Sequence, residues 1–266
     1  MDALPGKSNP VPTSPFRGRW LPLTILVFLL AALFLRLGTW QLARRAERLA
    51  ANAEIVARTQ QPPMTISGEL LDPEEANLRR ATARGVFDYS QEVILRNRTR
   101  NDYPGVHVLT PLKITGSDTA ILVDRGWIPY ESASPEDRRE FQNATGEVEV
   151  YGILRKSQER RGNVSPEDPI PAPASPNDAW HRVDLPKIRQ QLPYPLLTVY
   201  MEEDVPPGET PRVFPRPQPE ISLDEGSHLF YAIQWFAFTA IVVVGYVALY
   251  RQHTRDAART KGEQTT

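Results

Sequence analysis

The chain contains no cysteine, and this absence removes several classes of site at once. It excludes disulfides, thiolate metal centres, a cysteine nucleophile and haem attached covalently through cysteine. The signatures of nucleotide-binding proteins, zinc proteases and serine hydrolases are also missing from the sequence. Because no nucleophile–base or metal constellation is visible either, we do not expect an enzyme.

An excess of charge of one sign is also lacking, since 31 Lys and Arg residues nearly balance 32 Asp and Glu residues. A nucleic-acid-binding protein would carry a basic excess, so we expect no nucleic-acid partner. Proline, by contrast, is abundant at 26 residues and is concentrated in the second half of the chain. We expect the proline-rich segment 162–177 to form a long exposed loop.

Charge is absent from the whole run Leu229–Tyr250, and aromatic residues gather in its first half. An α-helix rises about 1.5 Å per residue, so a run of this length crosses the ~30 Å hydrocarbon core of a bilayer. Only Gln234 interrupts its apolar character, whereas a soluble core helix would show a polar stripe. The sequence therefore predicts a transmembrane helix over residues 228–250.

A second apolar run, Trp20–Leu35, lies near the N-terminus and is short for a complete span. Extending it to Leu42 restores the length and places Arg36 in or near the membrane edge. A signal peptide is the competing interpretation, because a basic start and an apolar centre fit one. However, no small-residue cleavage site follows the run. This favours an uncleaved transmembrane helix over residues 20–42.

The arginines and lysines that flank the two runs predict their orientation. The tail 251–266 is basic and the segment before the second run is acidic, so the tail is expected in the cytoplasm. Residues 1–19, expected to be disordered, then lie on the same side. Arg44, Arg45 and Arg48 resist this rule, and we interpret them as a solvated helix continuation or as contacts for anionic groups. The expected location is a bacterial-type cell membrane, or the mitochondrial inner membrane if the protein is eukaryotic.

Residues 43–227, between the two runs, are predicted to form an extracytoplasmic domain rich in β-strands. A helix is first expected to continue the first span to about Arg58. The expected strands are Met64–Leu71, two within Ala81–Arg98, Val106–Ile114, Ala120–Ile128, Glu147–Leu154 and Leu197–Met201, and the expected short helices are Ser134–Asn143 and Asp184–Gln191. Such close spacing predicts a membrane protein whose two transmembrane α-helices flank an α+β, mostly antiparallel, barrel- or sandwich-like domain.

Several blocks of sequence, taken in order, resemble those of one known family. They are Arg36–Arg44 (RLGTWQLAR), Gly85–Asp88, Gly105–Leu112, Val123–Pro129 (VDRGWIP), Glu147–Leu154, Trp180–Leu185 and His228–Phe236 (HLFYAIQWF). On these blocks the chain resembles the surfeit locus protein 1 family, membrane-anchored assembly factors of haem–copper terminal oxidases. Three features depart from the family pattern: Asp124 replaces an asparagine, an acidic run precedes His228, and segment 162–177 resembles an insertion.

The resemblance implies binding of haem a and its delivery to subunit I of cytochrome c oxidase, with haem a synthase as a second candidate partner. It makes His228 the candidate axial ligand of the haem iron, a role that imidazole commonly fills. Tyr231 and Trp235 follow at i+3 and i+7, so they share its helical face and offer aromatic surface to a flat ring. The alternative is that these residues only anchor the helix end in the membrane interface.

Arg36 is a second candidate, because a cation at the membrane edge is costly and suits a carboxylate such as a haem propionate. Trp40 lies four residues on and is expected to share its face. Arg36 equally fits a simple snorkelling role at the helix end.

Two other functions remain open. The first is a membrane-anchored chaperone that stabilises an oxidase subunit without binding haem. The second is an anchored extracytoplasmic sensor module. The short tail Arg251–Thr266 disfavours the sensor, because it is too small to be an output domain.

Overall fold

The computed structural model describes residues 14–18, 20–142, 144–160, 162, 166–168, 176–217, 219, 221 and 223–263. Most of the N-terminal segment and of the proline-rich loop predicted from the sequence therefore lie outside the described residues. The chain divides into two compact units, one made of Met1–Ala53 with Leu223–Thr266 and the other of Glu54–Ser222.

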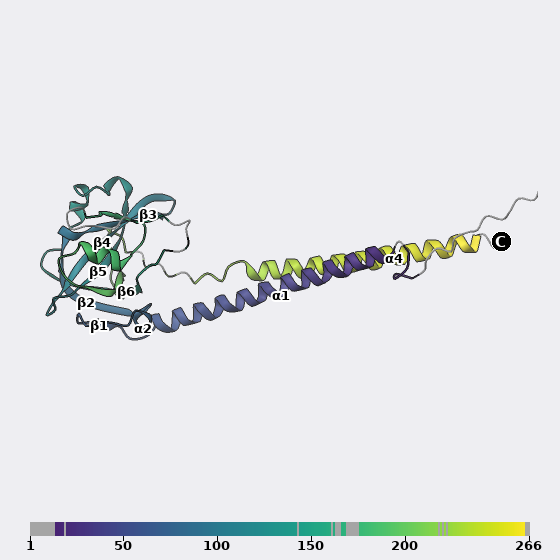
Figure 1. Ribbon diagram of the computed structural model, residues 1–266, viewed down its shortest axis with the longest axis horizontal. Helices are drawn as coiled ribbons and strands as arrows, with labels where there is room; N and C mark the ends of the chain where they lie inside the picture. Colours follow the sequence, from purple (N-terminus) through teal and green to yellow (C-terminus); the bar gives the residue numbers. More distant parts are fainter. Residues whose placement is uncertain are drawn as a thin grey trace, which may run out of the picture. The chain divides into compact units, whose positions relative to one another are not determined.

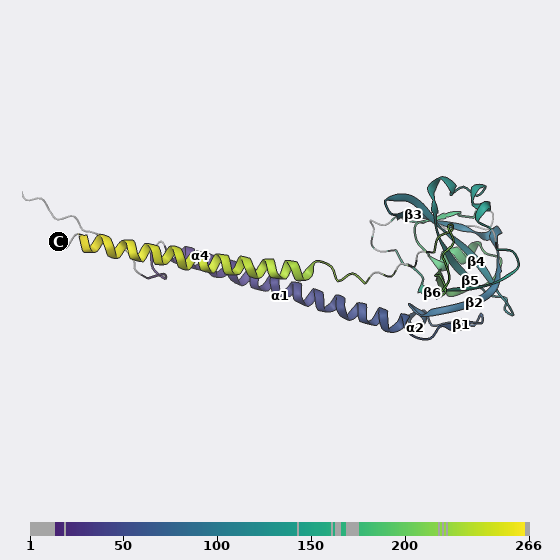
Figure 2. The same ribbon diagram turned by 180° about the vertical axis from the view of Figure 1, so that it is seen from behind.

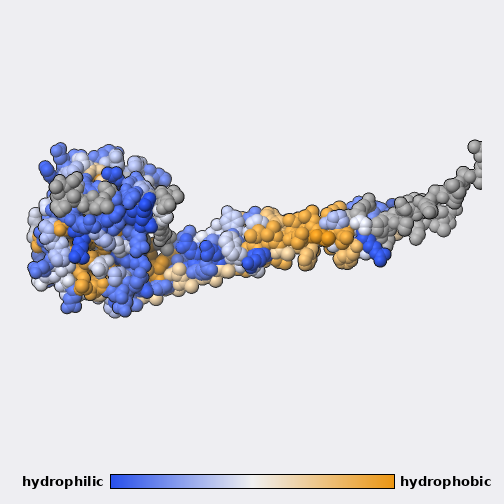
Figure 3. Space-filling view, in the orientation of Figure 1, coloured by the Kyte–Doolittle hydropathy of each residue, from blue (hydrophilic) through white to orange (hydrophobic). Residues whose placement is uncertain are grey.

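The first unit is built on two long helices. Helix α1 spans Trp20–Thr59 without a break, which confirms that the first apolar helix continues to about Arg58. Helix α4 spans His228–Glu263. Both are long and apolar enough to cross a membrane, by length and composition. Their apolar side chains form the continuous orange band in Figure 3.

The two helices pack side by side in opposite directions, as both ribbon views show (Figures 1 and 2). At one end Trp20 of α1 meets Tyr250 of α4, with ring centroids 5.4 Å apart. Farther along, Phe34 stacks on Trp235 at 5.6 Å. The α1 residues that make these contacts are spaced by three, four or ten positions, which places them on one face of the helix. We call this contact line the helix seam; its α1 members include Trp20, Thr24, Phe34, Gly38 and Gln41.

Gly38 is buried in the helix seam, where Phe236 occupies the space of a side chain. A Cβ at position 38 would lie 2.6 Å from Cε1 of the Phe236 ring. Small residues at such points let helix backbones approach closely. Gly38 therefore fixes both the closeness and the register of the pair.

The second unit is a mostly antiparallel β-barrel-like domain, as the sequence predicted. Its strands follow the order β1-β2-β6-β8-β5-β4-β3-β7, and an additional β2–β4 pairing closes five of them, β2, β6, β8, β5 and β4, into a ring. Strands β1, β7 and β8 each make a parallel pairing, with β2, β3 and β5 respectively. The strands are β1 Met64–Ile66, β2 Arg80–Phe87, β3 Val93–Arg100, β4 Tyr103–Ile114, β5 Ala120–Pro129, β6 Glu147–Lys156, β7 Ala179–Trp180 and β8 Leu196–Glu203.

Short helices fill the connections of this domain. They are α2 Pro73–Ala76, α3 Leu185–Ile188 and the 3₁₀ segments η1 Tyr89–Gln91, η2 Tyr130–Ser132, η3 Asp137–Phe141 and η4 Arg189–Gln191. The predicted helix over Ser134–Asn143 is thus a shorter 3₁₀ turn. The predicted strand Met64–Leu71 is also too long. It pairs with β2 only as far as Ile66, and Asp72 then caps helix α2 through the Glu74 amide.

A buried charged cluster links several elements of the barrel. Glu92 precedes β3, and its carboxylate lies 3.3 Å from Arg125 of β5 and 3.6 Å from Arg138 of η3. Thr110 of β4 donates a hydrogen bond of 2.7 Å to the same carboxylate. Burial raises the pKa of Glu92, while the hydrogen bond and the two arginines act against that rise. The guanidinium of Arg125 also lies over the ring of Phe87, 5.2 Å from its centroid.

Replacing Gly38 should loosen the helix pair, because Gly38→Leu must displace the Phe236 ring at a cost of about 1–3 kcal/mol. Since the chain has no cysteine, cysteines introduced at Thr24 and Tyr246, whose hydroxyls are 2.5 Å apart, can be joined by a short bismaleimide. We expect the cross-linking yield to fall in Gly38→Leu. It should stay unchanged in Gly245→Leu, where a Cβ meets no atom within 4 Å. Equal yields in the two variants would contradict this packing.

Removing Glu92 should strongly destabilise the barrel. Glu92→Leu leaves two buried guanidinium groups without their shared carboxylate, a loss of about 3–5 kcal/mol in the free energy of unfolding. The matched control is Glu74→Gln, which breaks only an exposed pair with Lys156 and should cost at most about 1 kcal/mol. Equilibrium unfolding in detergent, followed by near-UV circular dichroism, measures both. Similar losses of unfolding free energy in the two variants would show that the buried cluster contributes no more to stability than an exposed ion pair.

Candidate functional site

His228 is the first residue of helix α4, and a tight turn precedes it in the chain. Gly226 has φ +70, a conformation that favours glycine, and its amide donates a 3.0 Å hydrogen bond to Asp224. The backbone amide of Tyr231 donates to the Ser227 carbonyl in the first turn of the helix. The segment before α4 therefore presents the imidazole at the start of the helix seam.

The imidazole of His228 is held by Gln41 of α1. Nδ1 of His228 lies 2.8 Å from Oε1 of Gln41. An amide oxygen can only accept a hydrogen bond, so in the neutral imidazole this contact places the proton on Nδ1 and leaves Nε2 its lone pair. A Cβ at Gly226 would lie 3.3 Å from Nε2, so the glycine also keeps this edge of the ring uncrowded. The arrangement gives a half-buried nitrogen donor suited to a metal or a hydrogen-bond donor.

Aromatic side chains continue the helix seam beyond His228. Trp235, two turns further along α4, stacks on Phe34 and meets Phe238 edge-on at 5.9 Å. Tyr231, by contrast, is 46% exposed and contacts Phe230. The structure thus places His228 and Trp235 toward α1 and Tyr231 beside them on the outer surface.

Arg36 and Trp40 do not join this group. Both are exposed, while Gly38, which lies between them in sequence, is buried against α4. Because successive helix residues turn by about 100°, positions 36 and 40 lie on the side of α1 opposite the helix seam. The side chains of Arg36 and Trp40 therefore lie on a different face of α1 from the contact between Gln41 and His228, and both face the surroundings of the helix pair.

Two of the three arginines that follow the first apolar run, Arg44 and Arg45, have acidic partners. Arg45 lies 3.1 Å from Glu225, in the acidic run that precedes His228. Arg44 pairs with Glu47 at 2.7 Å. Asn52 donates to the carbonyl of Leu223. These contacts tie the segment before α4 to α1, although exposed ion pairs add little stability.

Sequence reasoning missed Gln41 as a part of this site, and it named Arg45 only as a helix continuation or a contact for anionic groups. Both lie on the same face of α1 as Gly38, at i+3 and i+7, and that spacing was a signal. The sequence did not reveal the register of α4 relative to α1. That register determines which residues Gln41 and Arg45 contact.

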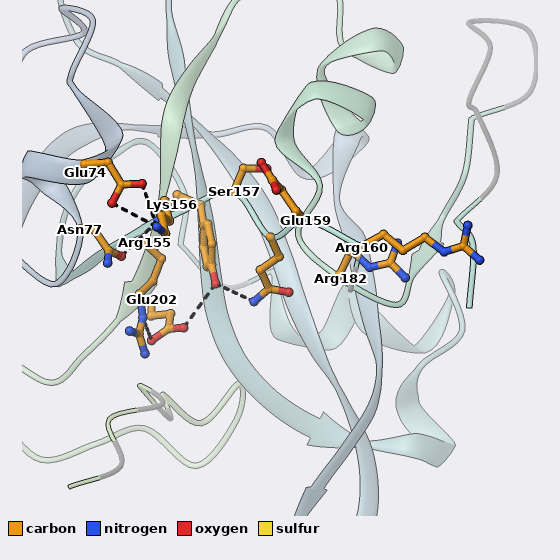
Figure 4. A pocket seen from close by; sticks show the side chains of 11 residues that line it. Glu74, Asn77, Arg155, Lys156, Ser157, Glu159, Arg160, Arg182 and Glu202 are labelled. Atoms are coloured by element: carbon orange, nitrogen blue, oxygen red, sulfur yellow. Dashed lines mark hydrogen bonds and ion pairs between the residues drawn. The ribbon is translucent and has the colours of Figure 1, made fainter. Parts of the chain in front are cut away.

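Several other polar groups of the β-barrel domain are paired with one another. His107 is buried and its Nδ1 lies 2.8 Å from Asp124. A pocket of ≈ 840 Å³ lies beside β6 and β8. There Arg155 meets Glu202 at 2.9 Å and Lys156 meets Glu74 at 2.8 Å (Figure 4). Among the residues that the structure describes, no group of three or more His, Cys, Asp or Glu side chains is placed to hold a metal ion.

Comparison with known proteins adds an independent finding. The model of the SURF1 family matches residues 28–240. Surfeit locus protein 1 of Xenopus tropicalis is 31% identical over 180 residues, which cover 62% of this chain and 56% of that protein. The human protein of the same name is 28% identical over 222 residues, covering 77% and 69%. That of Arabidopsis thaliana is 26% identical over 272 residues, covering 82% and 75%.

Proposed function

This chain belongs to the SURF1 family, and from that premise we propose that it is a membrane-anchored assembly factor that carries haem a to subunit I of a haem–copper cytochrome c oxidase. Haem a synthase is the proposed source of the cargo. The protein binds, protects and releases the haem without catalysing a reaction.

The observation that carries this proposal is the hydrogen bond between Gln41 and His228. Histidines that bind metals commonly donate the proton of one ring nitrogen to an oxygen, which leaves the other nitrogen for the metal. The bond to Gln41 Oε1 leaves Nε2 of His228 in that state. A single axial ligand suits a carrier, because the haem must leave again.

The surroundings of His228 also suit haem. The apolar helices provide a water-poor environment for the porphyrin, and Trp235 and Phe34 add aromatic surface along the same seam. His228 lies at the end of the apolar band, where propionates can reach water. Imidazole ligation with apolar walls is the usual protein environment of haem.

A second candidate function is a chaperone that holds an oxidase subunit without binding haem. The outward positions of Arg36 and Trp40 favour it, because a charged and an aromatic side chain on the outer face of a span can contact a partner helix.

We also propose that α1 and α4 cross the membrane once each, with both termini in the cytoplasm and the β-barrel domain outside. The antiparallel pairing of the helices supports this topology, because the first residues of α1 lie beside the last turns of α4. The basic tail 251–266 supports the cytoplasmic location of the termini, because basic residues flanking a span are enriched on the cytoplasmic side.

Haem binding is tested by the optical spectrum of the detergent-purified protein from cells that make haem a. Wild type should show a Soret band that His228→Ala loses or shifts. The control is His181→Ala in the β-barrel domain, which should keep the wild-type spectrum. Wild type without any haem, but purified together with subunit I, would replace the carrier proposal with the chaperone.

The proposed topology is tested with single cysteines, since the native chain has none. Asp118→Cys, in the exposed turn between β4 and β5, should react with an impermeant maleimide added to intact cells. Ala258→Cys, near the end of α4, should react only after the membrane is opened. The reverse pattern would overturn the proposed orientation, and labelling of both in intact cells would contradict two complete spans.

A further inference from the structure

We propose that Gln41 is the positioning residue of the His228 site, and that it makes haem binding depend on the pairing of α1 with α4. This inference rests on the proposed function, because it concerns the same histidine. It adds a residue from a different helix and a route by which the cargo is released.

The contact between the two side chains joins distant parts of the sequence. Gln41 lies near the middle of α1, and His228 is the first residue of α4, yet Nδ1 and Oε1 are 2.8 Å apart. At the start of a helix few neighbouring side chains restrain an imidazole. The hydrogen bond that Nδ1 of His228 donates to Gln41 therefore selects the tautomer and restrains the ring rotation of His228.

The type of residue at position 41 determines how strongly His228 can donate electrons. A neutral amide oxygen accepts a hydrogen bond from the N–H group at Nδ1, and this makes Nε2 moderately more electron-rich. A carboxylate at the same place would draw the proton more strongly and strengthen the donor. An apolar side chain would remove the bond and leave the ring free to rotate or to change tautomer.

The same bond couples the site to the helix seam. Gln41 follows Gly38 by less than one helical turn, and Gly38 sets the close approach through Phe236. A client helix that separates α1 from α4 would remove Gln41 from His228 without touching the imidazole. The iron ligand would then weaken at the moment when a receiving site is present, which favours transfer of the haem.

The test uses the full chain in detergent, loaded with haem a, as wild type, Gln41→Leu and Gln41→Glu. We expect haem dissociation to be about 10-fold faster in Gln41→Leu, the scale of effect seen when the partner of a metal-bound histidine is lost. The reduction potential should rise in Gln41→Leu and fall in Gln41→Glu, because a stronger donor stabilises ferric iron. Gln234→Leu, an exposed glutamine of α4, is the matched control and should behave as wild type.

A change in reduction potential separates positioning from a structural role, because loosened packing alone would not move it in opposite directions in the two Gln41 variants. If wild type binds haem and neither variant alters potential or dissociation, Gln41 has no such role and the carrier function stands. If wild type binds no haem, both proposals fall. Should Gln41→Leu fail to fold, the near-isosteric Gln41→Glu still decides the outcome through the sign of its shift.

Discussion

The close approach of α1 and α4 at Gly38 is the constraint on which the candidate site depends. Phe236 fills the space that a side chain at position 38 would need, so the register of the two helices is fixed there. One helical turn away, that register places Gln41 against His228. The site is therefore a product of helix packing, and not of a preformed cavity in the β-barrel domain.

The β-barrel domain is stabilised in a different way. Its ring of strands closes through the β2–β4 pairing, and a buried carboxylate, Glu92, pairs with two buried arginines, Arg125 and Arg138. Such a cluster is costly to bury and, once formed, still more costly to break. The polar pocket beside β6 is lined by cations that already have carboxylate partners. We therefore place the proposed haem chemistry on the helix pair and leave the barrel a supporting or client-binding role.

Local patterns were enough to predict much of this architecture from the sequence. The charge-free run before Tyr250, the uninterrupted helix to Thr59 and the hairpin between Ile114 and Ala120 all depend on residues near one another in the chain. Non-local pairings were not predictable in this way. The parallel contact of β8 with β5, the burial of Arg125 and the meeting of Gln41 with His228 are decided by which segments come together. The physical reason is that hydrophobic periodicity shows which face of a helix or strand is buried, but it does not show which other element packs against that face.

The most direct test is a structure of the haem-loaded protein in a lipid nanodisc. We predict that the iron is bonded to Nε2 of His228, that Nδ1 still donates to Gln41, and that α1 and α4 remain paired through Gly38. Haem held by another side chain, or bound with the Gln41–His228 contact broken, would contradict the proposed site.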